Sequence, residues 1–446
     1  MIPSRSRTVQ KADPSAQPHQ GAACKARPFR LFASDSGFGK GAGRGKGAGA
    51  VAKGADMAKG ILRGNDTHVG FAELFFDLVF VFAVTQVSHF LLKTYTLVGA
   101  VQAGILFQAI WMVWIYTTWV LNQIDPERGR VRALLFALML GGLFMSMALP
   151  RAFADRGLVF AVAFCAMQLG RTFFIYWTLH RVDAGRRAYR RILIWFLAAS
   201  VFWIAGGLAD PDTRLWLWLV AITIEFIAAL AGFFVPGLGR AQTTDWAVNG
   251  GHIAERCGLF VIICLGESLL VSGATFADRE WTGPATAAFL ASFAATIGMW
   301  WVYFDLGHKR GAQHIEQSDD PGRLARLAFS YFHIPIVAGV VLSAVGAERA
   351  IAHPGDAATY GEAASVMGGL LLFLLGNGYF KRVSAPHFPQ SHKVGLALCV
   401  VVAIAAPLTN LLTLNALSAA ILFLVASLEN RSVVEVVETL DDISVT

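Results

Sequence analysis

The chain alternates long apolar runs with short polar connections. A helix needs about 20 apolar residues to cross the hydrocarbon core of a bilayer, and runs of that length recur from residue 72 to residue 429. We expect membrane-spanning helices near 72–92, 98–121, 131–150, 157–180, 190–208, 214–235, 256–275, 284–305, 326–346, 363–381, 393–410 and 414–429. The pattern predicts an all-α polytopic membrane protein with about twelve transmembrane helices.

Lys and Arg are distributed unevenly between alternate connections. The connections on one side carry only Lys93, Arg151, Arg156, Arg214, Arg279 and Arg349. Those on the other side carry far more, including clusters at 128–132, 181–191 and 309–326. Cytoplasmic loops of membrane proteins carry the excess of Lys and Arg. We therefore predict that the N-terminus and the C-terminus are both cytoplasmic.

Short motifs recur in the same order in the two halves of the chain. "WIYTTW" (114–119) precedes "DPERGRVR" (125–132), and "WVYFDL" (301–306) precedes "DPGRLAR" (320–326). Glu73 before the first span corresponds to Glu255 before the seventh. We expect two six-helix repeats of the same orientation, at 67–240 and 241–430, related by an axis along the membrane normal.

Composition supports the membrane class and narrows the partners. Of 446 residues, 55% are hydrophobic and 15% are charged, with a mean hydropathy of +0.54, whereas soluble domains carry about 25% charged residues. The net charge of +7 comes from scattered loop residues, so we expect no nucleic-acid partner. The five cysteines form no C-x-x-C pair, and no cofactor motif is present.

The two ends of the chain differ from its apolar body. Residues 1–66 contain a Gly/Ala/Lys-rich tract whose composition predicts disorder. It has no apolar segment typical of a signal peptide, and Met57 is an alternative start. Residues 431–446 are expected to form a short cytoplasmic tail.

Two acids stand at the start of the first span. In "ELFFDLVFVF", Glu73 and Asp77 are four residues apart and so share one face of a helix. Charged side chains inside a membrane protein usually face the bundle interior or a water-filled cavity. We interpret this pair as part of a substrate or ion pathway; the alternative is an interfacial acid that pairs with a nearby Arg.

The seventh span carries a matching polar set. "GHIAERCGLFVIICLGESLL" places His252, Glu255 and Arg256 near its start and Glu267 eleven residues beyond Arg256. At 1.5 Å per residue, Glu267 lies about 16 Å deeper, too deep to reach the interface. We predict that Glu267 is the central pathway residue, supported by Ser268, and that Arg256 and His252 face Glu73 and Asp77.

Other polar residues are supporting candidates. Arg171 in the fourth span must find a partner, and we expect it to neutralise one of the acids, among which Glu225 lies in the sixth span. Asp305 and His333 are further candidates for charge partners. His252 and Glu255 carry ligand types suited to zinc or manganese, but their spacing is not that of a known metal motif, so we expect no metal site.

Four segments carry a resemblance to a known family. "ELFFDLVFVFAVTQVSHFL" (73–91), "ERCGLFVIICLGESLL" (255–270), "WWVYFD" (300–305) and "FHIPIVAGVVLSAVG" (332–346) resemble the bacterial low temperature requirement A (LtrA) family of integral membrane proteins. The similarity runs from about residue 67 to residue 429. It implies a multi-pass protein of the bacterial inner membrane, named for a growth phenotype in the cold. Glu73, Asp77, Glu255 and Glu267 match its motifs.

Three classes of function fit these observations. The first is a secondary transporter or channel-like protein in which Glu73, Asp77, Glu255 and Glu267 line a path for protons, cations or another small solute. The second is a membrane scaffold or sensor for growth at low temperature, in which buried polar groups hold helices in register. The third is an intramembrane enzyme. No nucleophile with a positioned His and no nucleotide-binding motif is present, so we expect no catalytic activity.

Overall fold

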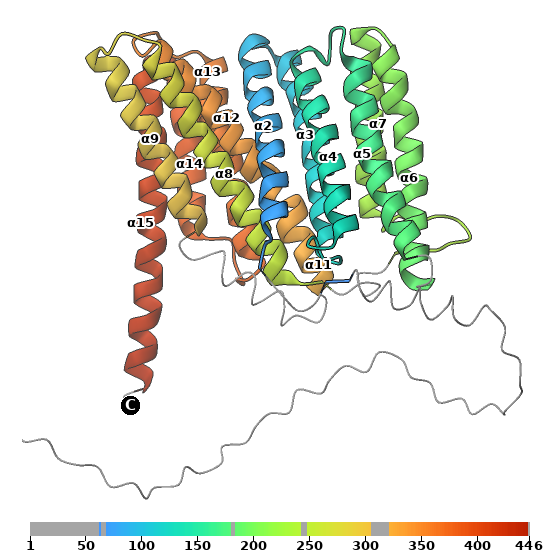
Figure 1. Ribbon diagram of the computed structural model, residues 1–446. Helices are drawn as coiled ribbons and strands as arrows, with labels where there is room; N and C mark the ends of the chain where they lie inside the picture. Colours follow the sequence, from blue (N-terminus) through green and yellow to red (C-terminus); the bar gives the residue numbers. More distant parts are fainter. Residues whose placement is uncertain (1–61, 64–67, 180–182, 242–247, 305–320, 445–446) are drawn as a thin grey trace, which may run out of the picture. The chain divides into compact units, whose positions relative to one another are not determined.

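The computed structural model describes residues 62–63, 68–179, 183–241, 248–304 and 321–444 (Figure 1). Asp305 and nearly all of the 1–66 tract lie outside these residues. The long helices of the first half are α2 (Phe71–Lys93), α3 (Leu97–Leu121), α4 (Gly129–Ala148), α5 (Gly157–Thr178), α6 (Asp183–Leu208) and α7 (Pro211–Leu230). Those of the second half are α8 (Gly250–Ala277), α9 (Gly283–Phe304), α12 (His333–Ala352), α13 (Tyr360–Arg382), α14 (Gln390–Ala405) and α15 (Leu411–Ser444).

Within the described residues, 12 helices are long and apolar enough to cross a membrane. This confirms the all-α polytopic class and the expected number of spans. The ninth span is longer than the sequence indicated, because the short helix α11 (Pro321–Ala325) and a π-helical turn η3 (Arg326–Tyr331) continue directly into α12. The last span likewise continues, because residues 431–444 of the expected tail belong to α15.

Polar residues set where several helices begin. The Thr96 hydroxyl accepts a hydrogen bond from the Gly99 amide at 3.0 Å and starts α3. Asn249 accepts from the His252 amide at 3.0 Å and starts α8. Each cap satisfies a backbone N–H that the helix itself leaves unpaired. The cap at Asn249 starts α8 six residues before the expected boundary, which places His252 and Arg256 inside the helix.

The helices of each half pack mainly with one another (Figure 1). In the first half, α2 contacts α4, α4 contacts α5, α5 contacts α6, α6 contacts α7, and α3 contacts α7. The second half has the same order of neighbours, with α8, α9, α12, α13, α14 and α15 in the equivalent places. This order is compatible with two six-helix repeats, which remain a prediction. The halves meet where α2 contacts α8 and α12 and where α3 contacts both of these helices.

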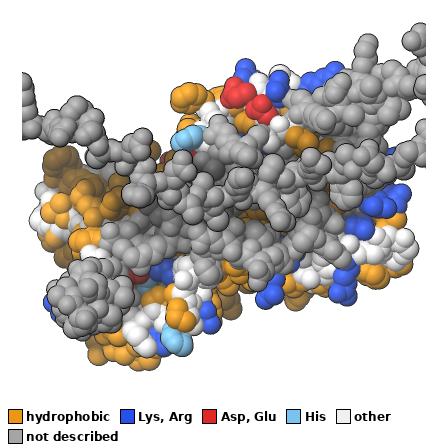
Figure 2. All heavy atoms as spheres, turned by 90° about the horizontal axis from the view of Figure 1, so that it is seen from below, with side chains coloured by type: hydrophobic (Ala, Val, Ile, Leu, Met, Phe, Trp, Pro, Cys, Tyr) orange, Lys and Arg blue, Asp and Glu red, His pale blue; other side chains and the backbone are white. Residues whose placement is uncertain are grey.

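Large apolar side chains face away from the packed interior. Leu140, Val201 and Leu230 are at least half exposed, as expected for residues that contact lipid in a membrane protein. The membrane face where α2 and α8 begin and α3 ends is here called the basic face. Most of the described Lys and Arg side chains outside the membrane-spanning segments belong to it, and Figure 2 shows them around its edge.

Candidate functional site

Arg256 of α8 pairs with both acids of α2. Its Nη1 lies 3.0 Å from Glu73 Oε1, and its Nη2 donates a hydrogen bond to Asp77 Oδ1. All three side chains have 0% solvent exposure. The two carboxylates share one face of α2 because they are four residues apart, and α8 presents Arg256 to that face. The predicted contact between these residues is confirmed.

His252 joins the same group of side chains. Its Nε2 lies 2.9 Å from Glu73 Oε1. The Asn122 amide nitrogen lies 3.2 Å from His252 Nδ1 and 2.8 Å from the Asn249 carbonyl oxygen, while Asn122 Oδ1 accepts from the Asn249 amide at 3.0 Å. These bonds fix Asn122 as a donor to Nδ1. His252 Nε2 lies 2.7 Å from Arg63 Nη1 as well, so it faces both a guanidinium and the Glu73 carboxylate.

Two further residues complete this group. Arg63, just before α2, places Nη1 3.4 Å from Glu73 Oε1 and donates to the Leu121 carbonyl at 3.0 Å. The indole N–H of Trp114 in α3 donates to Asp77 Oδ1 at 2.8 Å. Glu73, Asp77, Arg63, His252 and Arg256 are here called the ionic cluster. With His252 neutral, two carboxylates balance two guanidinium groups.

The ionic cluster ties three helices together in a place closed to solvent. Removing one partner of a buried ion pair costs about 3–5 kcal/mol, because the other charge remains buried without compensation. Two buried atoms in the cluster, Asp77 Oδ2 and Arg256 Nε, have no hydrogen-bond partner among the described residues. The cluster therefore stabilises the junction of the two halves. Asp77 Oδ2 could accept, and Arg256 Nε could donate, one further hydrogen bond.

Glu255, predicted as a pathway residue, does not join the ionic cluster. It is only half-buried and forms no hydrogen bond or ion pair with a described residue. One residue along a helix turns by about 100°, so Glu255 points away from the side on which Arg256 meets α2. No group of three His, Cys, Asp or Glu side chains that could hold a metal ion is found in the part of the chain that the structure describes.

Glu267 lies deeper in α8 and also faces α2. The Thr85 hydroxyl donates to Glu267 Oε1 at 2.8 Å. Among the described residues, Glu267 has no Lys, Arg or His partner. It is half-buried. Its carboxylate therefore lies at the α2–α8 interface without a cation nearby to balance a negative charge.

A small polar chamber begins one residue beyond Glu267. Its volume is about 20 Å³, which is room for roughly one water molecule. Hydroxyl groups from four helices line it, including those of Ser268, Ser272, Ser292, Ser343 and Ser418. The Ser343 hydroxyl is buried without a hydrogen-bond partner among the described residues. Ser268, predicted to support Glu267, is part of this wall.

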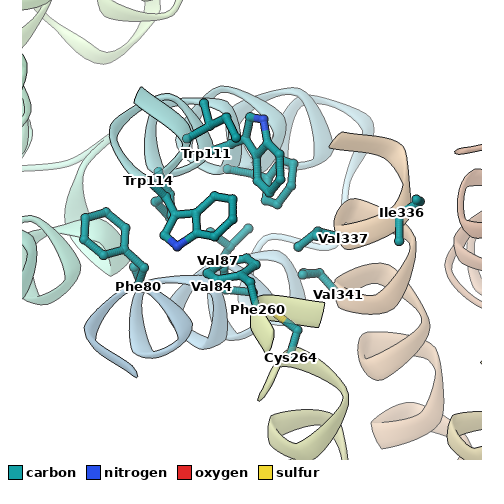
Figure 3. Close-up of a cluster of buried hydrophobic side chains, with 14 of the residues drawn as sticks. Phe80, Val84, Val87, Trp111, Trp114, Phe260, Cys264, Ile336, Val337 and Val341 are labelled. Atoms are coloured by element: carbon teal, nitrogen blue, oxygen red, sulfur yellow. The ribbon is translucent and has the colours of Figure 1, made fainter. Parts of the chain in front are cut away.

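Apolar side chains separate the ionic cluster from Glu267. Val84 of α2, Phe260 and Cys264 of α8, and Val337 of α12 meet at the junction of the halves, as Figure 3 shows. All four are buried. The Phe260 ring centroid lies 4.2 Å from that of Trp114, whose N–H bonds Asp77. These four residues are here called the apolar layer.

Arg171 was expected to neutralise one of the acids, and the structure connects it to Glu225 through Gln168. Its guanidinium donates to the Val113 carbonyl and the Thr117 hydroxyl, each at 3.1 Å, and to the Gln168 side-chain oxygen. Gln168 Nε2 in turn lies 3.5 Å from Glu225, and Glu225 accepts the Trp203 indole N–H at 2.9 Å. The described hydrogen bonds of this guanidinium thus all go to neutral acceptors, and Gln168 lies between Arg171 and Glu225.

His333 belongs to a different contact group. Its Nδ1 lies 2.8 Å from the Ala328 carbonyl oxygen and its Nε2 lies 2.7 Å from the Tyr303 hydroxyl. A carbonyl only accepts, so Nδ1 carries the proton and Nε2 accepts from Tyr303. His333 thus links α12 to α9 rather than to Glu267. Asp305, the other candidate charge partner, lies outside the described residues.

The sequence matches a known protein family. The sequence model described as "Bacterial low temperature requirement A protein (LtrA)" matches residues 68–427. The chain belongs to the LtrA family. An uncharacterized protein of Rhizobium meliloti (strain 1021) is 41% identical over 365 residues, which is 81% of this chain and 89% of the relative. The family match includes every described residue of the site except Arg63.

Proposed function

We propose that this LtrA-family protein is a secondary transporter or channel for protons or small cations, which move along the interface between α2 and α8. The observation that carries the proposal is Glu267, a half-buried carboxylate with a hydroxyl donor at 2.8 Å and no cationic partner among the described residues. Such a carboxylate inside a membrane protein is stabilised by taking up a proton or a cation.

The polar groups along α8 support a path with three polar sites. The ionic cluster lies near the basic face, Glu267 lies about 16 Å deeper at 1.5 Å per residue, and the serine-lined chamber follows at Ser268 and Ser272. The apolar layer interrupts the path between the first two of these sites. Hydrophobic constrictions gate channels by excluding water, so this arrangement corresponds to a closed state.

The ionic cluster favours a second candidate function. Its charges are balanced and link α2, α3 and α8 without any transported ion. A membrane scaffold or sensor that holds its helices in register in the lipid bilayer would need only these balanced contacts between helices. Glu267 is the residue that such a role leaves unexplained, since a scaffold gains nothing from an acid without a cationic partner.

Reconstitution of the full chain into liposomes distinguishes the two functions. We expect flux of protons or of one cation from a panel of Na⁺, K⁺ and methylammonium, at a rate well above that of empty liposomes. Folded protein without flux of any of these, under a membrane potential of either sign, would leave the scaffold as the better account.

A further inference from the structure

A second cavity lies on the other side of α3, near the basic face. Its volume is about 110 Å³, and its walls come from α3, α5, α6, α7 and the π-helical turn η3. Its lining includes the aromatic rings of Trp111, Tyr116, Trp119, Tyr189, Phe196, Phe233 and Tyr331. No residue of the ionic cluster lines it. Its chemistry is therefore separate from that of the proposed cation path.

The charge of this cavity is positive. Arg171 and Arg326 line it, and no Asp or Glu does so within the described residues. Arg171 is held by neutral acceptors. Arg326 is half-buried and has no hydrogen bond or ion pair with a described residue. A guanidinium beside aromatic walls, with its donors unused, is suited to a planar anionic group.

A π-helical turn presents Arg326, Ser330 and Tyr331 to the cavity. The Phe332 amide donates to the Leu327 carbonyl at 3.1 Å, five residues back. Two tryptophans of α3 hold this turn, since Trp111 donates to the Ser330 carbonyl at 2.9 Å and Trp119 donates to the Ser330 hydroxyl at 2.8 Å. π-helical turns are rare and occur frequently at functional sites. This turn is an observation independent of the cavity's charge.

We propose that the cavity binds a small organic anion with a flat apolar body, of the class of aromatic carboxylates. The carboxylate pairs with Arg326, and the ring lies between the aromatic walls formed by Trp111, Tyr116 and Phe233. Stacking on aromatic faces and bidentate pairing with a guanidinium are the two interactions that this combination of side chains offers. The cavity is too small for the two acyl chains of a phospholipid.

Equilibrium binding of radiolabelled benzoate to the purified full chain in detergent tests the proposal. We expect saturable binding that Arg326→Gln weakens at least tenfold. The matched control is Arg187→Gln, an exposed arginine on the same face that does not line the cavity and whose loss should leave binding unchanged. Arg326 has no partner among the described residues, so its variant should retain the melting temperature of the wild type.

Competition experiments separate the carboxylate from other ligands. Unlabelled benzoate should displace the label, whereas benzamide, of the same shape but neutral, and benzylammonium should not. The proposal is overturned if benzamide competes as well as benzoate, if Arg326→Gln binds like the wild type, or if only inorganic phosphate or short-chain phosphatidate displaces the label. Loss of cation flux in liposomes would not affect any of these outcomes.

Discussion

Arg256 of α8 and Asp77 of α2 form an ion pair to which solvent has no access. The two residues lie 179 positions apart in the chain, so the pair joins the first half of the protein to the second. Glu73 lies one turn before Asp77 and shares the same guanidinium at 3.0 Å. The junction of the halves is therefore held by opposite charges in the protein interior as well as by apolar packing.

Substitutions at this pair should be strongly coupled. Asp77→Asn and Arg256→Gln should each destabilise the protein by about 3–5 kcal/mol, because each leaves a buried charge without its partner. The double substitution should cost less than the sum of the two. Equilibrium unfolding in mixed detergent micelles measures all four proteins. Costs that add to within about 0.5 kcal/mol would show that the two side chains are not energetically coupled.

Trp114 should contribute to this pair through its indole N–H. Trp114→Phe keeps an aromatic ring against Phe260 but removes the donor to Asp77, and a lost hydrogen bond to a charged group costs about 1.5–3 kcal/mol. Trp177→Phe, on the exposed surface of α5, is the matched control and should change the unfolding free energy by less than about 0.5 kcal/mol. Equal changes in the unfolding free energy for the two variants would mean that the Trp114–Asp77 hydrogen bond does not stabilise the protein.

The basic face should be cytoplasmic, because Lys and Arg concentrate on that side. The described native cysteines are buried, so single cysteines introduced at exposed positions report topology. A membrane-impermeant thiol reagent added to intact cells should label Asp155→Cys and Asp212→Cys but not Arg186→Cys. Labelling at position 186 without permeabilisation would reverse the orientation.

The N-terminal tract should be dispensable. Its Gly/Ala/Lys-rich composition offers too little apolar surface to form a core, and the family match begins only at residue 68. A chain that starts at Met57 should insert into the membrane and melt at the same temperature as the full chain, as measured by intrinsic fluorescence. A lower melting temperature would assign a structural role to residues 1–56.

The apolar layer should control passage along the α2–α8 interface. Val337→Thr adds a hydroxyl of similar shape at a fully buried position, which favours water in the layer and should raise basal ion flux in liposomes. Val201→Thr, on the lipid-facing surface of α6, introduces the same change outside the layer and should have no effect. An unchanged rate for Val337→Thr would place the barrier elsewhere.

The features that could be predicted from the sequence are those that depend on local pattern, namely the spans and the contact between Asp77 and Arg256. Apolar runs of about 20 residues predict spans, and helical periodicity together with the repeated motifs brought Asp77 and Arg256 together. The sequence did not identify Arg63, Asn122 or Trp114, because their roles depend on where other helices pack. The "WIYTTW" motif was the available signal for Trp114.

Two site residues lie where sequence spacing could not place them. Glu255 was predicted as a pathway residue near Arg256, and it lies outside the ionic cluster because adjacent residues on a helix point about 100° apart. Arg171 was expected to neutralise an acid, and it reaches Glu225 through Gln168 while oxygens of Val113 and Thr117 accept its other hydrogen bonds. The π-helical turn at Arg326 shifts the register of the ninth span, and periodicity with a fixed repeat cannot reveal such a change.

Proton flux through Glu267→Gln proteoliposomes tests the proposed function most directly. Liposomes loaded with a pH-sensitive dye should acidify under an imposed potential when they contain the wild type, and Glu267→Gln should slow this at least tenfold because the amide cannot carry a proton. Glu280→Gln, the same change at an exposed position after α8, should match the wild type. Equal rates for Glu267→Gln and the wild type, or a wild-type rate equal to that of empty liposomes for protons and every cation of the panel, would contradict the account.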